Sequence, residues 1–167
     1  MRQSPPALAD APRQLYNKTV ELSWSAQLVE HGPDGKTVTP TINASRIIYV
    51  SSAGRLFTRS SRTNSKIGLS KVEDHAPGAS RNNEGEARDL RFVGNQMIGN
   101  VAFVNGAGHL TATFDSNFSS CSLALIYGRD SGGMKRRGLN GVMYIVDSLS
   151  VSGERCSIRE GNPFASP

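Results

Sequence analysis

The sequence predicts an all-β protein, and three observations lead to that fold class. Apolar and polar residues alternate with a period of two along several segments, turn-forming residues separate those segments, and no long stretch shows helical periodicity. About eight or nine short antiparallel strands at this spacing are typical of a single β-barrel or of a two-sheet β-sandwich. We favour the antiparallel barrel, because closure removes the exposed edges of a protein built from strands alone.

In the first half of the chain the clearest strand begins at Lys18. Residues at even positions from 20 to 28 are apolar and the residues between them are polar, which is the pattern of a strand with one buried face. The turn 31–36, with one proline and two glycines, ends this strand. A second strand is expected over 42–51, and the turn 51–54 returns the chain into a third strand over 55–59.

The second half of the chain alternates short strands with turns. Asn105-Gly106 favours positive φ at both positions, so the sequence predicts a tight hairpin between strands over 96–104 and 109–115. The remaining strands are expected over 88–93, 121–127, 142–146, 149–152 and 156–159.

One long connection, 60–87, lacks strand periodicity and is predicted to be a loop. Loops of this length are commonly lids, binding loops or disordered segments. The expected organisation is a flexible segment over 1–14 followed by a single β domain over 15–164 that carries this loop. Acidic residues dominate from 73 to 86, whereas the charged residues from 55 to 71 are all basic: Arg55, Arg59, Arg62, Lys66 and Lys71.

Composition and charge narrow the class of protein. The 167 residues carry a formal net charge of +5, and the pI near 9.6 favours anionic partners such as acidic glycans, nucleic acid or anionic membrane surfaces. No apolar run is long enough for a membrane-spanning helix. Ala7-Leu8-Ala9 has the small-x-small form of a signal-peptidase site, and the polar residues after it resemble the start of an exported mature chain.

The two cysteines, Cys121 and Cys156, belong to no Cys-x-x-Cys motif and to no histidine cluster. We interpret them as a disulfide, because each opens an apparent strand and neighbouring strands can bring them together. Such a bridge would stabilise the fold by roughly 3–4 kcal/mol through the entropy of the unfolded chain. Two buried free thiols in a cytosolic protein are the alternative.

The segment 129–141, RDSGGMKRRGLNG, combines basic side chains with glycines and is predicted to be an exposed hairpin tip. Its spacing differs from that of a Walker phosphate loop and no helix is expected after it, so a nucleotide site is not supported. An exposed basic tip suits contact with a polyanion. The candidate ligand- or polyanion-binding residues are therefore the basic residues of 55–71 together with Arg129, Lys135, Arg136 and Arg137.

Two aromatic residues, Trp24 and Tyr127, are candidates for the lining of a ligand pocket, although a core position is the favoured role of Trp24. The histidines His31, His75 and His109 are far apart in the sequence, and no metal site is predicted. The chain contains neither G-x-S-x-G nor S-x-x-K, and no cofactor is expected.

Three phrases carry a resemblance to known proteins: YVSSAGRLF at 49–57, FDSNFSSCS at 114–122 and SGERCSIREGN at 152–162. With them, residues 15–164 resemble small uncharacterised exported proteins of alphaproteobacteria. The resemblance implies export through a cleaved signal and one bridge between Cys121 and Cys156. It carries no activity with it and therefore assigns no functional residue.

Three hypotheses of function follow. The first is a non-enzymatic periplasmic or secreted β-barrel that binds a small ligand or a partner molecule, with 60–87 covering one end. The second is a small secreted hydrolase whose polar site is assembled across strands. The third is a polyanion-binding module that uses the basic segments 55–71 and 129–137.

Overall fold

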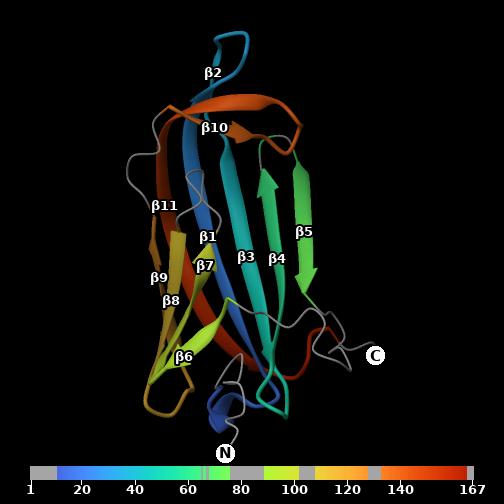
Figure 1. The fold of residues 1–167 in the computed structure, drawn as a ribbon, viewed down its shortest axis with the longest axis vertical. Helices are drawn as coiled ribbons and strands as arrows, with labels where there is room; N and C mark the ends of the chain where they lie inside the picture. Colours follow the sequence, from blue (N-terminus) through green and yellow to red (C-terminus); the bar gives the residue numbers. More distant parts are fainter. Residues whose placement is uncertain are drawn as a thin grey trace, which may run out of the picture.

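The fold is built from two antiparallel β-sheets, and Figure 1 shows them in a computed structural model. The structure describes residues 11–64, 66, 68–75, 89–101, 108–127 and 133–164, with the backbone alone for 71–75. No α-helix occurs in these ranges, and a single 3-10 turn, η1 (Arg13–Leu15), precedes the first strand. The all-β prediction is confirmed.

The first sheet is a strongly curled half-barrel of seven strands. Its strand order is β10-β11-β1-β3-β4-β5, and the short β2 also pairs with β1. The strands are β1 (Lys18–His31), β2 (Thr37–Val38), β3 (Thr41–Val50), β4 (Leu56–Asn64), β5 (Leu69–His75), β10 (Met134–Arg137) and β11 (Met143–Glu160).

The second sheet has four strands in sequential order and packs on one face of the first sheet, which we call the inner face (Figure 1). Its strands are β6 (Arg91–Val93), β7 (Gln96–Val101), β8 (Gly108–Phe114) and β9 (Cys121–Ile126). No strand ladder joins the two sheets in the part of the chain that the structure describes. The arrangement fits both the barrel and the sandwich that the sequence predicts.

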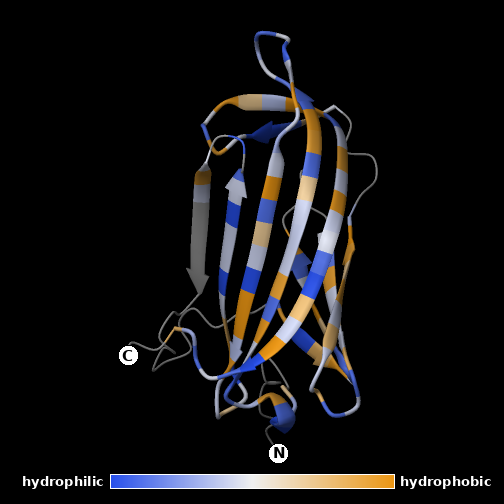
Figure 2. Ribbon diagram, turned by 180° about the vertical axis from the view of Figure 1, so that it is seen from behind, coloured by the Kyte–Doolittle hydropathy of each residue, from blue (hydrophilic) through white to orange (hydrophobic). Residues whose placement is uncertain are grey.

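The main core lies between the two sheets. Alternate residues of β1 and β3 point inward, and Figure 2 shows the resulting alternation of hydropathy along these strands. They meet the inward residues of β7, β8 and β9, and η1 adds Leu15, which is fully buried. The largest members of this core are Leu15, Leu22, Trp24, Ile48, Leu56, Leu90, Met97, Leu110, Phe114 and Phe118.

A disulfide links the two sheets at their shared side. Cys121 opens β9 and Cys156 lies on β11, with 5.4 Å between their Cα atoms. The predicted bridge is confirmed. It fastens β9, at the edge of the second sheet, to β11. No strand ladder joins these two strands among the described residues.

The prediction of a loop over 60–87 is wrong for much of its length. β4 continues to Asn64, and β5 pairs with it from Leu69 to His75. One hydroxyl pair joins β3 to β4, and another joins β4 to β5. Oγ of Ser45 lies 2.6 Å from Oγ of Ser61, and Oγ1 of Thr63 lies 2.8 Å from Oγ of Ser70. The hairpin therefore has no apolar alternation to reveal it, and residues 76–88 lie outside the described ranges.

Three further expectations differ from the structure. The strands expected over 142–146, 149–152 and 156–159 form one long strand, β11, because the polar residues between them make bulges where turns were expected. Part of the expected flexible segment 1–14 belongs to the fold, since Ala11 packs against the core. The hairpin predicted at Asn105-Gly106 lies outside the described residues.

Candidate anion-binding face

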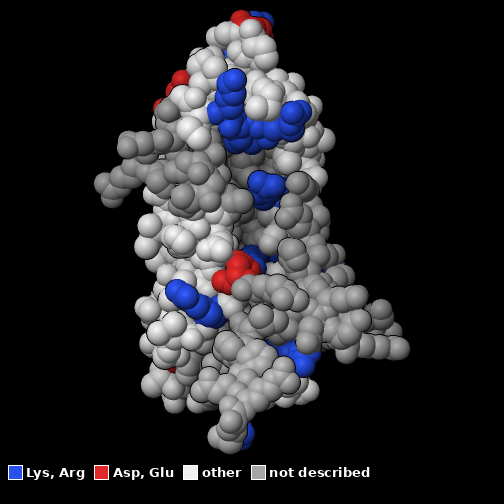
Figure 3. Space-filling view, viewed as in Figure 1, with Lys and Arg blue, Asp and Glu red and all other residues white. Residues whose placement is uncertain are grey.

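Arginines gather on the inner face of the first sheet, at the edge of the area that the second sheet covers and beyond it. Arg46 of β3 pairs with Ser60 of β4, and the next inward pair on the same strands is Ala44 with Arg62. Arg46 and Arg62 are therefore diagonal neighbours on one face. Figure 3 views the molecule from this side and shows Lys and Arg atoms bordering a hollow, from the β10 end towards the middle.

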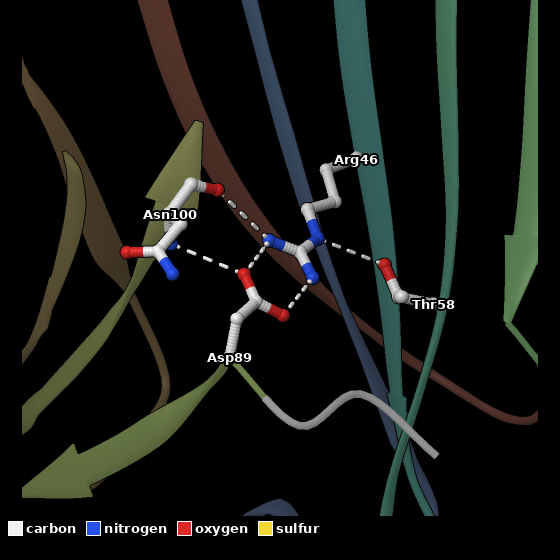
Figure 4. Close-up of polar contacts among 4 residues, drawn as sticks. All are labelled: Arg46, Thr58, Asp89 and Asn100. Carbon is white, nitrogen blue, oxygen red and sulfur yellow. Dashed lines mark hydrogen bonds and ion pairs between the residues drawn. The ribbon is translucent and has the colours of Figure 1, made fainter. Parts of the chain in front are cut away.

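Arg46 is buried, and each of its three guanidinium nitrogens donates a hydrogen bond (Figure 4). Its two terminal nitrogens donate to the two carboxylate oxygens of Asp89, at 2.8 and 2.7 Å, in a bidentate pair. Nε donates to the hydroxyl of Thr58 at 3.0 Å, and Nη1 also donates to the carbonyl of Asn100. Asn100 is on β7 of the second sheet, and Asp89 lies just before β6. This network therefore joins the two sheets.

The carboxylate of Asp89 is held in its charged form. Burial alone raises its pKa, but the hydrogen bonds and charge of Arg46, with the backbone N–H of Asn100, outweigh that effect. The pKa of Asp89 consequently lies below its ordinary value. The Arg46–Asp89 pair therefore remains charged at neutral pH.

A second bidentate pair lies nearer the β10 end of the same face. Nε and Nη2 of Arg136 on β10 donate to the two carboxylate oxygens of Glu30 on β1, at 3.0 and 2.7 Å. Glu30 is almost fully buried, with 1% of its side chain exposed. The charge of Arg136 is thus neutralised inside the fold. The sequence predicts instead that Arg136 is presented at an exposed tip.

Arg62 differs from Arg46 and Arg136 because its side chain is exposed. It makes no ion pair or side-chain hydrogen bond with any residue that the structure describes. On one side it faces Ala44, which in turn faces Trp24, so these three residues form one cross-strand row. Arg62 is the best candidate on this face to receive an anionic ligand.

Further basic residues surround the open end of this face. Lys66, in the turn between β4 and β5, donates from Nζ to Oγ1 of Thr39 at 2.7 Å. Lys135 and Arg137 are exposed on β10, which pairs with β11 over Met134–Arg137 where a loop tip was predicted. The tip prediction is therefore wrong for residues 134–137.

The remaining predicted basic residues do not join this face. Arg55 lies at the opposite end of β4, in the turn that follows β3. Arg59 is on the outer face, where its guanidinium lies 5.1 Å from the ring centre of Phe164. The side chain of Lys71 and the whole of Arg129 lie outside what the structure describes.

The two aromatic residues predicted to line a pocket have structural contacts. Trp24 packs in the core, with 9% of its surface exposed. The hydroxyl of Tyr127 accepts a hydrogen bond from the backbone N–H of Val151 on β11, at 3.3 Å. Tyr127 thereby connects the end of β9 to β11 in a region where the two strands share no ladder among the described residues.

An open groove of about 780 Å³ lies at another place, around the disulfide, and sequence analysis gave no indication of it. Strands β3, β1, β11 and β9 line it, and its walls contain no aromatic residue. Most of its polar groups are hydroxyls, and the lining residues are Glu21, Leu22, Ser23, Ser45, Ile47, Cys121, Ser122, Leu123, Glu154, Arg155, Cys156 and Ser157. We consider it a weaker candidate, because it is open and Glu21 is already paired with Arg159.

The hydrolase hypothesis requires a nucleophile next to a base. Nδ1 of His31 lies 3.2 Å from a carboxylate oxygen of Asp147, which the bulge in β11 brings beside it. Both side chains are substantially exposed, and no serine hydroxyl is bonded to His31 among the described residues. The same part of the chain holds no cluster of three metal-binding side chains.

Sequence reasoning missed the acidic partners Asp89 and Glu30 and the acceptor Thr58. Glu30 carried a usable signal, because it continues the even-numbered inward series of β1 from Val20 to Leu28 and so occupies a buried position. A buried carboxylate requires a cation. Asp89 carried no such signal, since its position depends on how the second sheet sits on the first.

The fold and this face define an all-β, disulfide-linked protein with an arginine-lined inner face. A scan against protein-family models, a search of curated proteins and a search of solved structures each found no match to the chain. No helix in the described ranges is both long and apolar enough to cross a membrane.

Proposed function

We propose that the protein is a periplasmic or secreted, non-enzymatic binding protein that holds an anionic ligand on its inner face. The observation that carries this proposal is the exposed Arg62, which has no acidic partner in the described part of the chain and is a diagonal neighbour of the fully paired Arg46. The disulfide supports the location, because such bridges persist in oxidising compartments.

The chemistry of Arg62 points to a carboxylate, sulfate or phosphate group. A guanidinium presents a planar set of donors that matches two oxygens of such groups, and charge-assisted pairs of this kind are stronger than neutral hydrogen bonds. Arg46 and Arg136 add positive potential, although their own acidic partners reduce it. The net charge of +5 favours the approach of any anion.

Binding is better supported than hydrolysis on this face. The two inward carboxylates, Asp89 and Glu30, are each occupied by an arginine, so neither is available as a base. The contact between His31 and Asp147 lies away from Arg62 and is exposed to solvent. The arrangement therefore offers an exposed positive group, and no nucleophile is bonded to a base beside it among the described residues.

Titration with a heparin oligosaccharide tests the proposal, with the fluorescence of Trp24, the sole tryptophan, as the signal. Trp24 shares a row with Arg62, so an anion bound there should change its emission. Arg62→Gln should weaken binding about tenfold, the loss expected for one charge-assisted hydrogen-bonded contact. The slope of log affinity against log salt should become shallower by about one.

Arg55→Gln is the matched control, because it removes the same charge from an exposed site at the far end of β4. It should leave the affinity and the Trp24 signal nearly unchanged. Equal losses in both variants would mean that the protein attracts anions by net charge alone and that Arg62 is not a site. Inorganic sulfate in place of heparin distinguishes a small anion site from one that requires a polymer.

A further inference from the structure

One end of the molecule concentrates exposed apolar side chains. This end comprises the last residues of β1, the short β2, the β4–β5 turn with the first residue of β5, and the β10–β11 hairpin, and we call it the hairpin end (Figure 1). Two exposed large apolar residues, Val93 and Ile126, lie elsewhere in the described chain. The others belong to the hairpin end: Val29, Val38, Leu69, Met134, Val142, Met143 and Ile145.

The β10–β11 hairpin combines these apolar groups with cations in a regular pattern. Lys135 is directly opposite Ile145, and Arg137 is directly opposite Met143, so all four side chains share one face. Each apolar side chain of these pairs is more than a third exposed. The hairpin from 133 to 146 contains no acidic residue. Its outer face is therefore both apolar and positively charged.

The surroundings of the hairpin add little negative charge to oppose this. Glu30 is buried and paired with Arg136, and Asp147 lies against His31. Asp34 accepts the backbone N–H of Lys36 in the neighbouring turn. Lys36 itself is exposed, and Lys66 lies nearby through its bond to Thr39.

We propose that the hairpin end docks on the surface of an anionic lipid bilayer. Apolar side chains at a protein tip gain free energy by entering the headgroup region, and lysine or arginine beside them is attracted to anionic lipids. Val142 and Met143, at and just after the turn of the β10–β11 hairpin, enter the headgroup region. Lys135 and Arg137 remain at the level of the lipid phosphates.

A bilayer fits this end better than a second copy of the chain. Two hairpin ends placed together would bring like charges into contact, and their mutual repulsion opposes a dimer. A soluble polyanion would use the cations but would leave the exposed apolar side chains in water. Both partners remain as outcomes of the experiment below, where each would overturn the proposal.

Co-sedimentation with lipid vesicles provides the test. The full chain is mixed with vesicles of phosphatidylcholine alone or with about one third phosphatidylglycerol, a surface that attracts basic segments. We expect binding to the anionic vesicles only. The Lys135→Gln/Arg137→Gln variant should lower the partition coefficient about thirtyfold, from two basic groups near the surface. The Met143→Ser/Ile145→Ser variant should lower it about tenfold or more.

The matched control is Arg13→Gln/Arg55→Gln, which makes the same change in net charge at the opposite end. It should retain most of the vesicle binding, and Arg62→Gln should also bind vesicles normally, which keeps this test separate from that of the anion site. All the substituted residues are exposed, and circular dichroism checks that each variant folds.

Four results would overturn the proposal. The native chain would fail to sediment with anionic vesicles, or the hairpin and control variants would lose binding equally. Alternatively, sedimentation velocity would show a concentration-dependent dimer that Met143→Ser/Ile145→Ser abolishes, which would assign the apolar face to a second copy of the chain. Retention on heparin without vesicle binding would assign the cations to soluble polyanions.

Discussion

Nη2 of Arg46 lies 2.7 Å from Oδ1 of Asp89, and this contact is half of a bidentate pair that joins the two sheets. Arg46 is on β3 in the first sheet, whereas Asp89 immediately precedes the second sheet. The apolar core holds the sheets face to face without directional contacts. The Arg46–Asp89 pair adds a contact with fixed geometry.

Removing one partner of this pair should be costly. Arg46→Met leaves the carboxylate of Asp89 largely desolvated and without its cation, so the free energy of unfolding should fall by about 3 kcal/mol. Urea denaturation measures it. Arg55→Met, at an exposed turn, should change stability by less than about 0.5 kcal/mol.

A double substitution separates pairing from packing. Asp89→Asn in the Arg46→Met background removes the stranded charge, so the double variant should lose less stability than the two single losses combined. Additive losses would mean that the pair does not couple the sheets.

The pH dependence of stability should show the contribution of Asp89. Its pKa in the folded protein is lowered, so its contribution is present above its ordinary pKa, near 3.8 in the unfolded chain, and is lost as the pH falls through the folded value. The native protein should therefore lose more stability than Asp89→Asn between neutral pH and acid. Urea denaturation at a series of pH values measures both curves. Parallel curves would contradict this.

Loss of the disulfide should destabilise the fold without abolishing the first sheet. Replacing both Cys121 and Cys156 by alanine removes a cross-link between positions 35 residues apart, and about 3–4 kcal/mol of stability should be lost. Because the bridge fastens β9, hydrogen exchange should increase more at β9 than at β1 and β3. A uniform increase would indicate that the bridge stabilises the whole fold equally.

Substitution of Gly54 should destabilise the fold, because its backbone has a positive φ and because Tyr16 lies close to it. Its φ is +80°, and a Cβ there would lie 2.8 Å from the hydroxyl oxygen of Tyr16. Gly54→Ala should cost about 2 kcal/mol, measured by thermal unfolding. Gly35→Ala is the control, since Gly35 has φ +76° and no atom near its Cβ position. It should cost about 1 kcal/mol, from the backbone alone. Equal losses would remove Tyr16 from the explanation.

The strands that have one apolar face and one polar face can be predicted from the sequence. The strands whose two faces are similar in polarity cannot. β1 is recognisable because its even positions are apolar, and β8 likewise. The hairpin of β4 and β5 is joined by hydroxyl pairs such as Thr63 with Ser70, which leave no apolar pattern. β11 was divided into three because a residue such as Gly153, with φ +69°, signals a turn and a bulge equally.

The candidate site was predicted in residue type but not in arrangement. Clustering in the sequence suggested that Arg55, Arg59 and Arg62 act together, yet strand alternation and strand length place them on different faces and at different ends. Arg136 looked exposed because its partner, Glu30, is more than a hundred residues away in the chain. Contacts of that range depend on the pairing of strands, which a single sequence does not specify.

The pairing of β1 with β11 also has a consequence for how the chain reaches this fold. The first long strand lies in the middle of its sheet and requires the last strand, from Lys18 against Glu160 to His31 against Ile145, to complete one of its two sides. Contacts so distant in the sequence slow folding, because the chain must close a large loop before it gains them. If the N-terminal part is synthesised or transported first, β1 can therefore pair with β3 only, and its other edge stays unpaired until β11 is present.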